Sequence, residues 1–228
     1  AVASDRGYSI EFVFDTHVHA DHISGGRELA DHVGATYYLS ADAADRGVTN
    51  DYRPLERNEV VTLGEIDIKA VPTPGHTSEI VSYLVDREAV LTGDTLFVDS
   101  VGRTELQFGA GDADDGAERL YDSLHRTLLA EPDPITVLPG HFAVAPDGTT
   151  DVTPGEAVAT TIGAVRTDLE LLTVDRETFV SRLTDSLPEK PANYETIIDV
   201  NAGGDVPDDG ATPTELEIGP NNCAATGD

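Results

Sequence analysis

Three imidazoles and a carboxylate fall within six consecutive positions, as His17, His19, Asp21 and His22. They follow an apolar stretch over residues 10–14 that is typical of a buried strand. In an extended segment the side chains at i and i+2 point the same way, so His17 and His19 can face one ion together. Asp21 and His22 come at the following turn, where they can meet a neighbouring ion. This density of metal-ligand residue types predicts that the chain binds metal.

Three further candidate ligands lie downstream, each where an apolar run ends in a Gly-containing loop. They are His76, Asp94 and His141. Functional side chains collect on loops that a rigid sheet holds in place. Together with the first cluster they form a set suited to zinc, manganese or non-haem iron. The other two histidines, His32 and His125, lie inside helical patterns without ligand neighbours, and we interpret both as structural or solvated.

The composition sets limits on partners and location. The chain of 228 residues carries 14 basic and 43 acidic side chains, a net charge of −29. The acids are dispersed, as on proteins from salt-loving organisms, where high ionic strength screens their repulsion. No basic stripe is present, so nucleic acid is not an expected partner. The chain has a single cysteine, Cys223, which excludes an internal disulfide and fits a reducing cytoplasm. We interpret it as a partly buried free thiol. No apolar run reaches the length of a membrane span.

The apolar pattern predicts alternating strands and helices in one α/β unit. We expect strands at 9–14, 35–39 and 135–138, hairpins of 59–63 with 66–71 and of 80–86 with 89–93, and helices at 24–33, 113–129 and 175–187. Another helix is predicted to begin at Thr153, since Pro154 and Glu156 suit the first turn and the capping box. The simplest division is a catalytic domain over residues 1–200 and a loose acidic tail of the same domain over 201–228.

The ordered motifs resemble the ligand signature of the metallo-β-lactamase fold. They are His17-x-His19-x-Asp21-His22, Gly75-His76-Thr77, Gly93-Asp94-Thr95 and Pro139-Gly140-His141. The resemblance implies an αββα sandwich with metal held at one edge of two packed sheets. The family normally has two or more strands ahead of the histidine-rich motif, so these N-terminal strands are expected to be missing from this chain.

Within that family the chain resembles the branch that contains glyoxalase II and the persulfide dioxygenases. Residues 93–97 and the Gly-Arg-Thr motif at 102–104 carry this resemblance. The segment 187–201 resembles the C-terminal stretch of persulfide dioxygenases, some of which are fused to a rhodanese module. Glyoxalase II usually has a basic C-terminal helical region, whereas the corresponding region here is acidic. The dioxygenase is therefore the favoured branch, although Val101 stands where some of its members have a cysteine.

A persulfide dioxygenase of this kind binds one non-haem Fe(II) per chain. The resemblance assigns that ion to His17, His76 and Asp94, a two-histidine, one-carboxylate set with three open positions. It implies oxidation of a low-molecular-weight thiol persulfide with O2 to sulfite and thiol. The remaining candidate ligands would then orient the ligands and bound water, namely His19, Asp21, His22 and His141.

Two expectations concern catalysis beyond the iron ligands. Asp21 and Arg103 are the predicted catalytic side chains, and Arg103 is predicted to bind a carboxylate of the thiol, because its planar fork suits carboxylates. The alternative for Arg103 is a structural salt bridge. Related enzymes are commonly dimers, which leaves a homodimer open.

The same residues also suit a different enzyme, a glyoxalase II-type thioester hydrolase with two Zn(II). Asp94 would bridge the two ions, and a bridging water would attack the thioester carbonyl. The ligands would divide into two sets, His17 with His19 and His76, and Asp21 with His22 and His141. A third alternative is a non-catalytic or electron-transfer domain of the same fold, which the intact ligand set disfavours.

Overall fold

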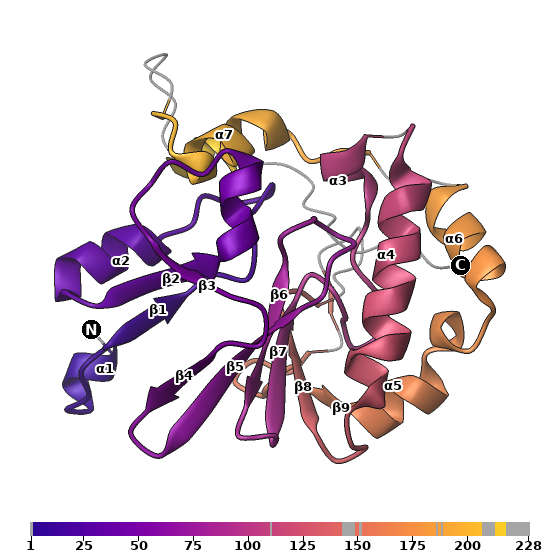
Figure 1. Cartoon of the computed structure of the whole chain (residues 1–228), viewed down its shortest axis with the longest axis horizontal. Helices are drawn as coiled ribbons and strands as arrows, with labels where there is room; N and C mark the ends of the chain where they lie inside the picture. The colour runs from indigo at the N-terminus through magenta and orange to yellow at the C-terminus, as the bar shows by residue number, and fades with distance from the viewer. Residues whose placement is uncertain are drawn as a thin grey trace.

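A computed structural model describes residues 2–109, 111–142, 149–150, 152–185, 187, 189–206 and 213–217. Cys223 lies outside these residues. Over the described ranges, a pair of β-sheets packs face to face (Figure 1). The outer side of one sheet is covered by α2 (Gly26–Val33) and α7 (Tyr194–Ala202), and that of the other by α4 (Ala113–Arg126), α5 (Ile162–Asp168) and α6 (Arg176–Thr184). The predicted αββα arrangement is confirmed.

The first sheet is parallel and, over the described residues, three-stranded in the order β1-β2-β3. The strands are β1 (Phe12–Phe14), β2 (Thr36–Ser40) and β3 (Arg53–Leu55). A short helix, α1 (Val2–Asp5), precedes them. Helix α2 (Gly26–Val33) connects β1 to β2, and a 3-10 helix, η1 (Ala41–Arg46), follows β2. Strand β1 is shorter than the predicted 9–14.

The second sheet contains six strands within the described ranges, in sequence order from β4 to β9. They are β4 (Val60–Leu63), β5 (Ile66–Pro72), β6 (Val81–Val85), β7 (Ala89–Gly93), β8 (Thr136–Pro139) and β9 (Thr160–Thr161). Both predicted hairpins are confirmed. The β6–β7 turn holds Asp86 and Arg87 at φ of 47° and 59°, left-handed values of the kind that tight hairpin turns require, and Glu88 N donates to Val85 O.

Three apolar clusters fill the spaces between the layers. Between the two sheets, Tyr38 and Leu55 of the first pack against Val61 and Tyr83 of the second. A larger cluster joins the outer face of the second sheet to α4, α5 and α6. A smaller one lies on the outer side of the first sheet and includes Ile198 of α7. Close packing on both faces fixes the position of each sheet, and therefore the positions of the loops at its edge.

The helices in the second half depart from the sequence prediction at two places. Those described are α3 (Glu105–Phe108), α4 (Ala113–Arg126), α5 (Ile162–Asp168), α6 (Arg176–Thr184), α7 (Tyr194–Ala202) and α8 (Pro213–Leu216), with 3-10 turns η2 (Leu128–Ala130) and η3 (Glu170–Leu172). The prediction that a helix begins at Thr153 is wrong. There, Glu156 N donates to Thr153 O in a turn with Gly155 at φ 91°, and the helix begins only at Ile162, capped by Thr161.

The second departure is α7, which crosses residue 200 where the sequence predicted a loose tail. Its first turn follows Asn193, which adopts φ 60°, and Gly203 at φ 116° ends it. Its buried side chains are Ile197 and Val200. None of the helices in the described ranges is long and apolar enough to pass through a bilayer.

Candidate metal centre

Four loops converge at one edge of the sandwich, and each begins where a strand ends. The loop after β1 carries the histidine-rich run, and the loops after β5, β7 and β8 carry His76, Asp94 and His141. The sequence placed each candidate at a strand end, and the fold brings these ends together.

The carboxylate of Asp94 lies at the centre of the group. Its Oδ2 atom is 3.9 Å from His17 Nε2, 3.5 Å from His76 Nε2 and 3.3 Å from His141 Nε2. His17, His76 and Asp94 are 2%, 1% and 1% exposed. Within the described residues, His17 Nε2 and Asp94 Oδ2 have no hydrogen-bond partner. Buried polar atoms without partners are costly, and ligand atoms spaced this way can surround one ion at about 2.0–2.2 Å from each. The residues present therefore fit a metal ion.

A second group lies beside the first and is more open to solvent. His19, Asp21 and His22 offer ligand atoms that all lie within 4.8 Å of one another. Asp21 Oδ1 is 3.1 Å from His22 Nδ1, and Asp21 Oδ2 is 3.4 Å from His141 Nε2. The side chain of His22 is 43% exposed. His141 thus stands between the two carboxylates and links the two groups.

Contacts on the far side of the buried imidazoles orient both rings, and for His76 the contact also sets the tautomer. His76 Nδ1 lies 2.7 Å from the backbone oxygen of Arg103, which can only accept, so Nδ1 carries the proton. His17 Nδ1 lies 2.8 Å from the hydroxyl of Thr16. Both arrangements leave Nε2 directed at Asp94, as a metal-binding imidazole requires.

Two glycines allow the loops to approach this closely. A Cβ on Gly102 would lie 1.8 Å from the backbone oxygen of Asp94. One on Gly140 would lie 2.7 Å from Asp94 Oδ1. Gly102 and Gly140 are thus required by contact with the loop that carries Asp94.

The charge states suit metal binding. Burial lowers the pKa of His17 well below its usual value, and the neighbouring imidazoles of His19 and His76 lower it further. Burial alone would raise the pKa of Asp94, but the close approach of His141 Nε2 and the charge of His76 lower it overall. A neutral imidazole and an ionised carboxylate are the forms that bind a cation.

The side chain of Arg103 forms an ion pair inside the protein. Its side chain is 1% exposed, its Nε donates to Glu105 Oε1 at 2.6 Å, and its Nη2 contacts the same oxygen. A third nitrogen, Nη1, donates to the backbone oxygen of Glu189. This geometry favours the structural ion pair over a contact with a substrate carboxylate. The contribution of Arg103 to the centre is made by its backbone oxygen, through His76.

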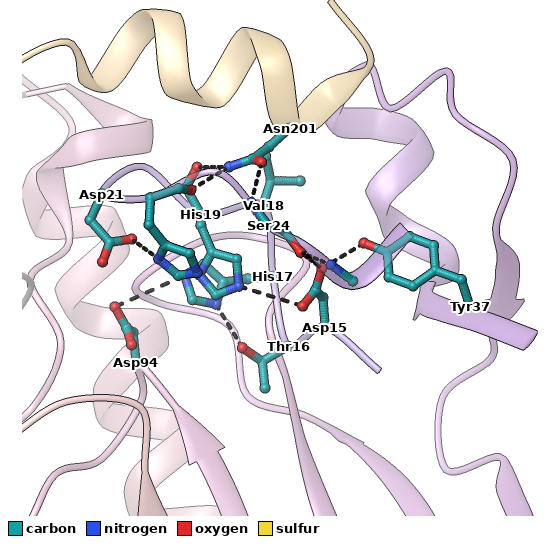
Figure 2. A network of polar contacts seen from close by, with 12 residues as sticks. Asp15, Thr16, His17, Val18, His19, Asp21, Ser24, Tyr37, Asp94 and Asn201 are labelled. Atoms are coloured by element: carbon teal, nitrogen blue, oxygen red, sulfur yellow. Dashed lines mark hydrogen bonds and ion pairs between the residues drawn. The ribbon is translucent and has the colours of Figure 1, made fainter. Parts of the chain in front are cut away.

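Sequence reasoning missed several residues that support the histidine-rich loop. The carboxylate of Asp15 accepts from Tyr37 Oη at 2.6 Å and from Ser24 Oγ, and lies 3.8 Å from His19 Nε2 (Figure 2). Glu79 Oε1 accepts from the Val18 amide at 2.9 Å. Both acids lie within three positions of a candidate ligand, but so do many acids in so acidic a chain, and nothing in the sequence singles them out.

Comparison with known proteins places the fold in a family. The model of the metallo-beta-lactamase superfamily matches residues 3–141, a range that contains all four motifs. The chain belongs to the metallo-β-lactamase superfamily. Members of this superfamily are metal-dependent enzymes.

Relatives within the superfamily carry different names. Hydroxyacylglutathione hydrolase from Brucella anthropi is 31% identical over 145 residues, which are 63% of this chain and 49% of the relative. The chain therefore spans about half the length of such relatives. A solved metallo-beta-lactamase from Staphylococcus aureus has a TM-score of 0.78 and 27% identity, over 91% of this chain and 62% of its own. The structure of ETHE1 from Myxococcus xanthus has a TM-score of 0.70 and 30% identity, over 88% of this chain and 78% of its own.

Proposed function

We propose that this protein is a persulfide dioxygenase that uses one Fe(II), held by His17, His76 and Asp94, to oxidise a low-molecular-weight thiol persulfide with O2 to sulfite and thiol. The observation that carries the proposal is the asymmetry of the ligand groups. The three residues of the first group are buried, and two of their metal-facing atoms lack partners among the described residues. In the second group, Asp21 is buried but its partner His22 has a side chain that is 43% exposed.

When bound, a ferrous ion on two imidazoles and one carboxylate supplies redox chemistry and open positions for two substrates. The protein holds the ligands and sets their charge. His141 contacts both Asp94 and Asp21 on the more open side of the centre, with its side chain 27% exposed. The His141–Asp21 pair can therefore hold a water or a proton beside the ion. We propose that this is the catalytic role of Asp21.

Two further lines support the dioxygenase branch. In the segment that resembles persulfide dioxygenases, residues 194–201 form most of α7, and Asn201 donates to the histidine-rich loop. The second line is the likeness to ETHE1, a persulfide dioxygenase, which superposes on 88% of this chain with 30% sequence identity.

One observation favours the second candidate, a thioester hydrolase with two Zn(II). The Nδ1 atom of His19 is also buried without a partner in the described ranges of the chain, and a binuclear site would use it as a third ligand of the first ion. The relatives named hydroxyacylglutathione hydrolase support the same interpretation.

Metal stoichiometry in variants separates the two candidates. Protein loaded with Fe(II) should hold about one ion per chain, and His76→Ala should lose it, because two ligands are too few for this site. His22→Ala should keep one ion, with activity altered through its neighbours. His32→Ala, in α2 and exposed, is the matched control. Two ions per chain in the unmodified protein, falling to one in His22→Ala, would favour the binuclear hydrolase.

A further inference from the structure

The loop that carries the first four candidate ligands contains no helix or strand between β1 and α2. Backbone amides and carbonyls in such a loop need partners from elsewhere in the molecule. Side chains supply several of them. Glu79 accepts from the Val18 amide at 2.9 Å, and Glu217, just beyond α8, accepts from the Ile23 amide at 2.7 Å.

Asn201, near the end of α7, makes the largest contribution from one residue. Its Nδ2 donates to His19 O at 2.9 Å and to His22 O at 2.8 Å. Its Oδ1 accepts from the Ser24 amide at 2.9 Å. Figure 2 shows the amide reaching from α7 onto the loop. Both hydrogens and the oxygen of one amide are used, and the bonds span the segment that contains Asp21.

The position of Asn201 is itself fixed by packing. Ile197 and Val200 of the same helix are buried, and Ile198 and Ala202 contact the cluster around Val18. The helix ends against the first sheet's loops, where Thr49 N donates to Ala202 O at 2.8 Å. The amide is therefore presented from a rigid element, which is the arrangement that a positioning group requires.

We infer that Asn201 is a positioning residue of the metal centre. It does not touch the ion or a substrate. By joining the carbonyls of residues 19 and 22 to the amide of residue 24, it sets the curvature of the loop, and with it the directions of His19, Asp21 and His22. The C-terminal helix then belongs to the metal site, and this holds whichever of the two reactions the centre performs.

The test compares two variants of the same helix. Asn201→Leu keeps the size of the side chain and removes all three hydrogen bonds without adding charge. Asn193→Gly is the matched control, because Asn193 Nδ2 also donates to a backbone oxygen, that of Leu216 at 3.1 Å, and glycine tolerates its φ of 60°. The Zn²⁺ dissociation constant of each full-length variant is measured by competition with a chromophoric chelator. Amide hydrogen exchange of the loop is followed in the metal-free proteins.

Loss of groups that orient metal ligands weakens metal binding by about 10–100-fold. We therefore expect Asn201→Leu to raise the Zn²⁺ dissociation constant by about that factor, with faster exchange over residues 18–24, and Asn193→Gly to leave both unchanged. Equal affinity in the two variants would overturn the inference, as would equal weakening in both. If Asn201→Leu does not fold, Asn201→Ala removes the same three hydrogen bonds without adding an apolar branch, and unchanged affinity in that variant would overturn the inference.

Discussion

The Nδ1 atom of His76 lies 2.7 Å from the backbone oxygen of Arg103, so a candidate iron ligand is oriented by the residue expected to bind substrate. The guanidinium of Arg103 points elsewhere, into a buried pair with Glu105. Backbone and side chain of one residue thus have separate tasks. The backbone fixes an imidazole, and the side chain neutralises a carboxylate that is 1% exposed.

Removing the guanidinium should therefore lower the free energy of unfolding and leave the affinity for the substrate little changed. Arg103→Ala leaves Glu105 buried without its cation, and the breaking of a buried pair costs about 3–5 kcal/mol of unfolding free energy. Replacing both members, Arg103→Met with Glu105→Met, should recover most of that loss, because apolar substitutes for a buried pair are often neutral. Urea unfolding of the metal-free proteins measures both effects. A raised KM with an unchanged urea midpoint in Arg103→Ala would instead favour a contact between Arg103 and the substrate.

Salt should stabilise the fold strongly. The net charge of −29 produces self-repulsion, which is screened over about 3 Å at 1 M salt and about 10 Å at 0.1 M. We expect the thermal midpoint to rise steeply as KCl increases from dilute buffer to molar concentrations. Sodium sulfate at matched ionic strength separates screening from ion-specific effects. A midpoint that does not change with KCl would exclude adaptation to high salt.

Two tyrosines beside the histidine-rich loop should resist ionisation. Burial, together with the carboxylate of Asp15, raises the pKa of both Tyr37 and Tyr83 far above the usual value of 10. Near pH 10 the unfolded chain releases these protons and the folded chain keeps them, so their contribution to stability is complete below pH 10 and falls as pH rises beyond it. An alkaline titration followed by tyrosinate absorbance should show a late phase that Tyr37→Phe reduces. A late phase of unchanged amplitude in Tyr37→Phe would contradict this assignment.

The candidate metal ligands can be recognised in the sequence because their chemistry is local. Histidine and aspartate at strand ends are visible in one dimension, and a sandwich brings strand ends to one edge. The hairpins at Gly64 and Arg87 were equally visible, since strand period and turn residues lie within a few positions of one another.

The features that were missed depend on contacts across the chain. Thr153 has the side chain of a helix cap, but Gly155 turns the backbone away and the helix begins at Ile162. Asn201 follows the histidine-rich loop by about 180 positions, and only the packing of α7 brings the two together. From the sequence, the ion pair of Arg103 was one of two alternatives. The burial of its side chain in the folded chain is what favours the ion pair over a substrate contact.

The most direct test of the proposed function supplies both substrates to one preparation. Protein expressed with iron available and purified without oxygen is given glutathione persulfide and, separately, S-lactoylglutathione, with Asp94→Ala as the inactive control. We predict O2 consumption and sulfite release with the persulfide, dependent on about one Fe(II) per chain. A protein that ignores the persulfide, hydrolyses the thioester and holds two zinc ions would contradict the dioxygenase proposal.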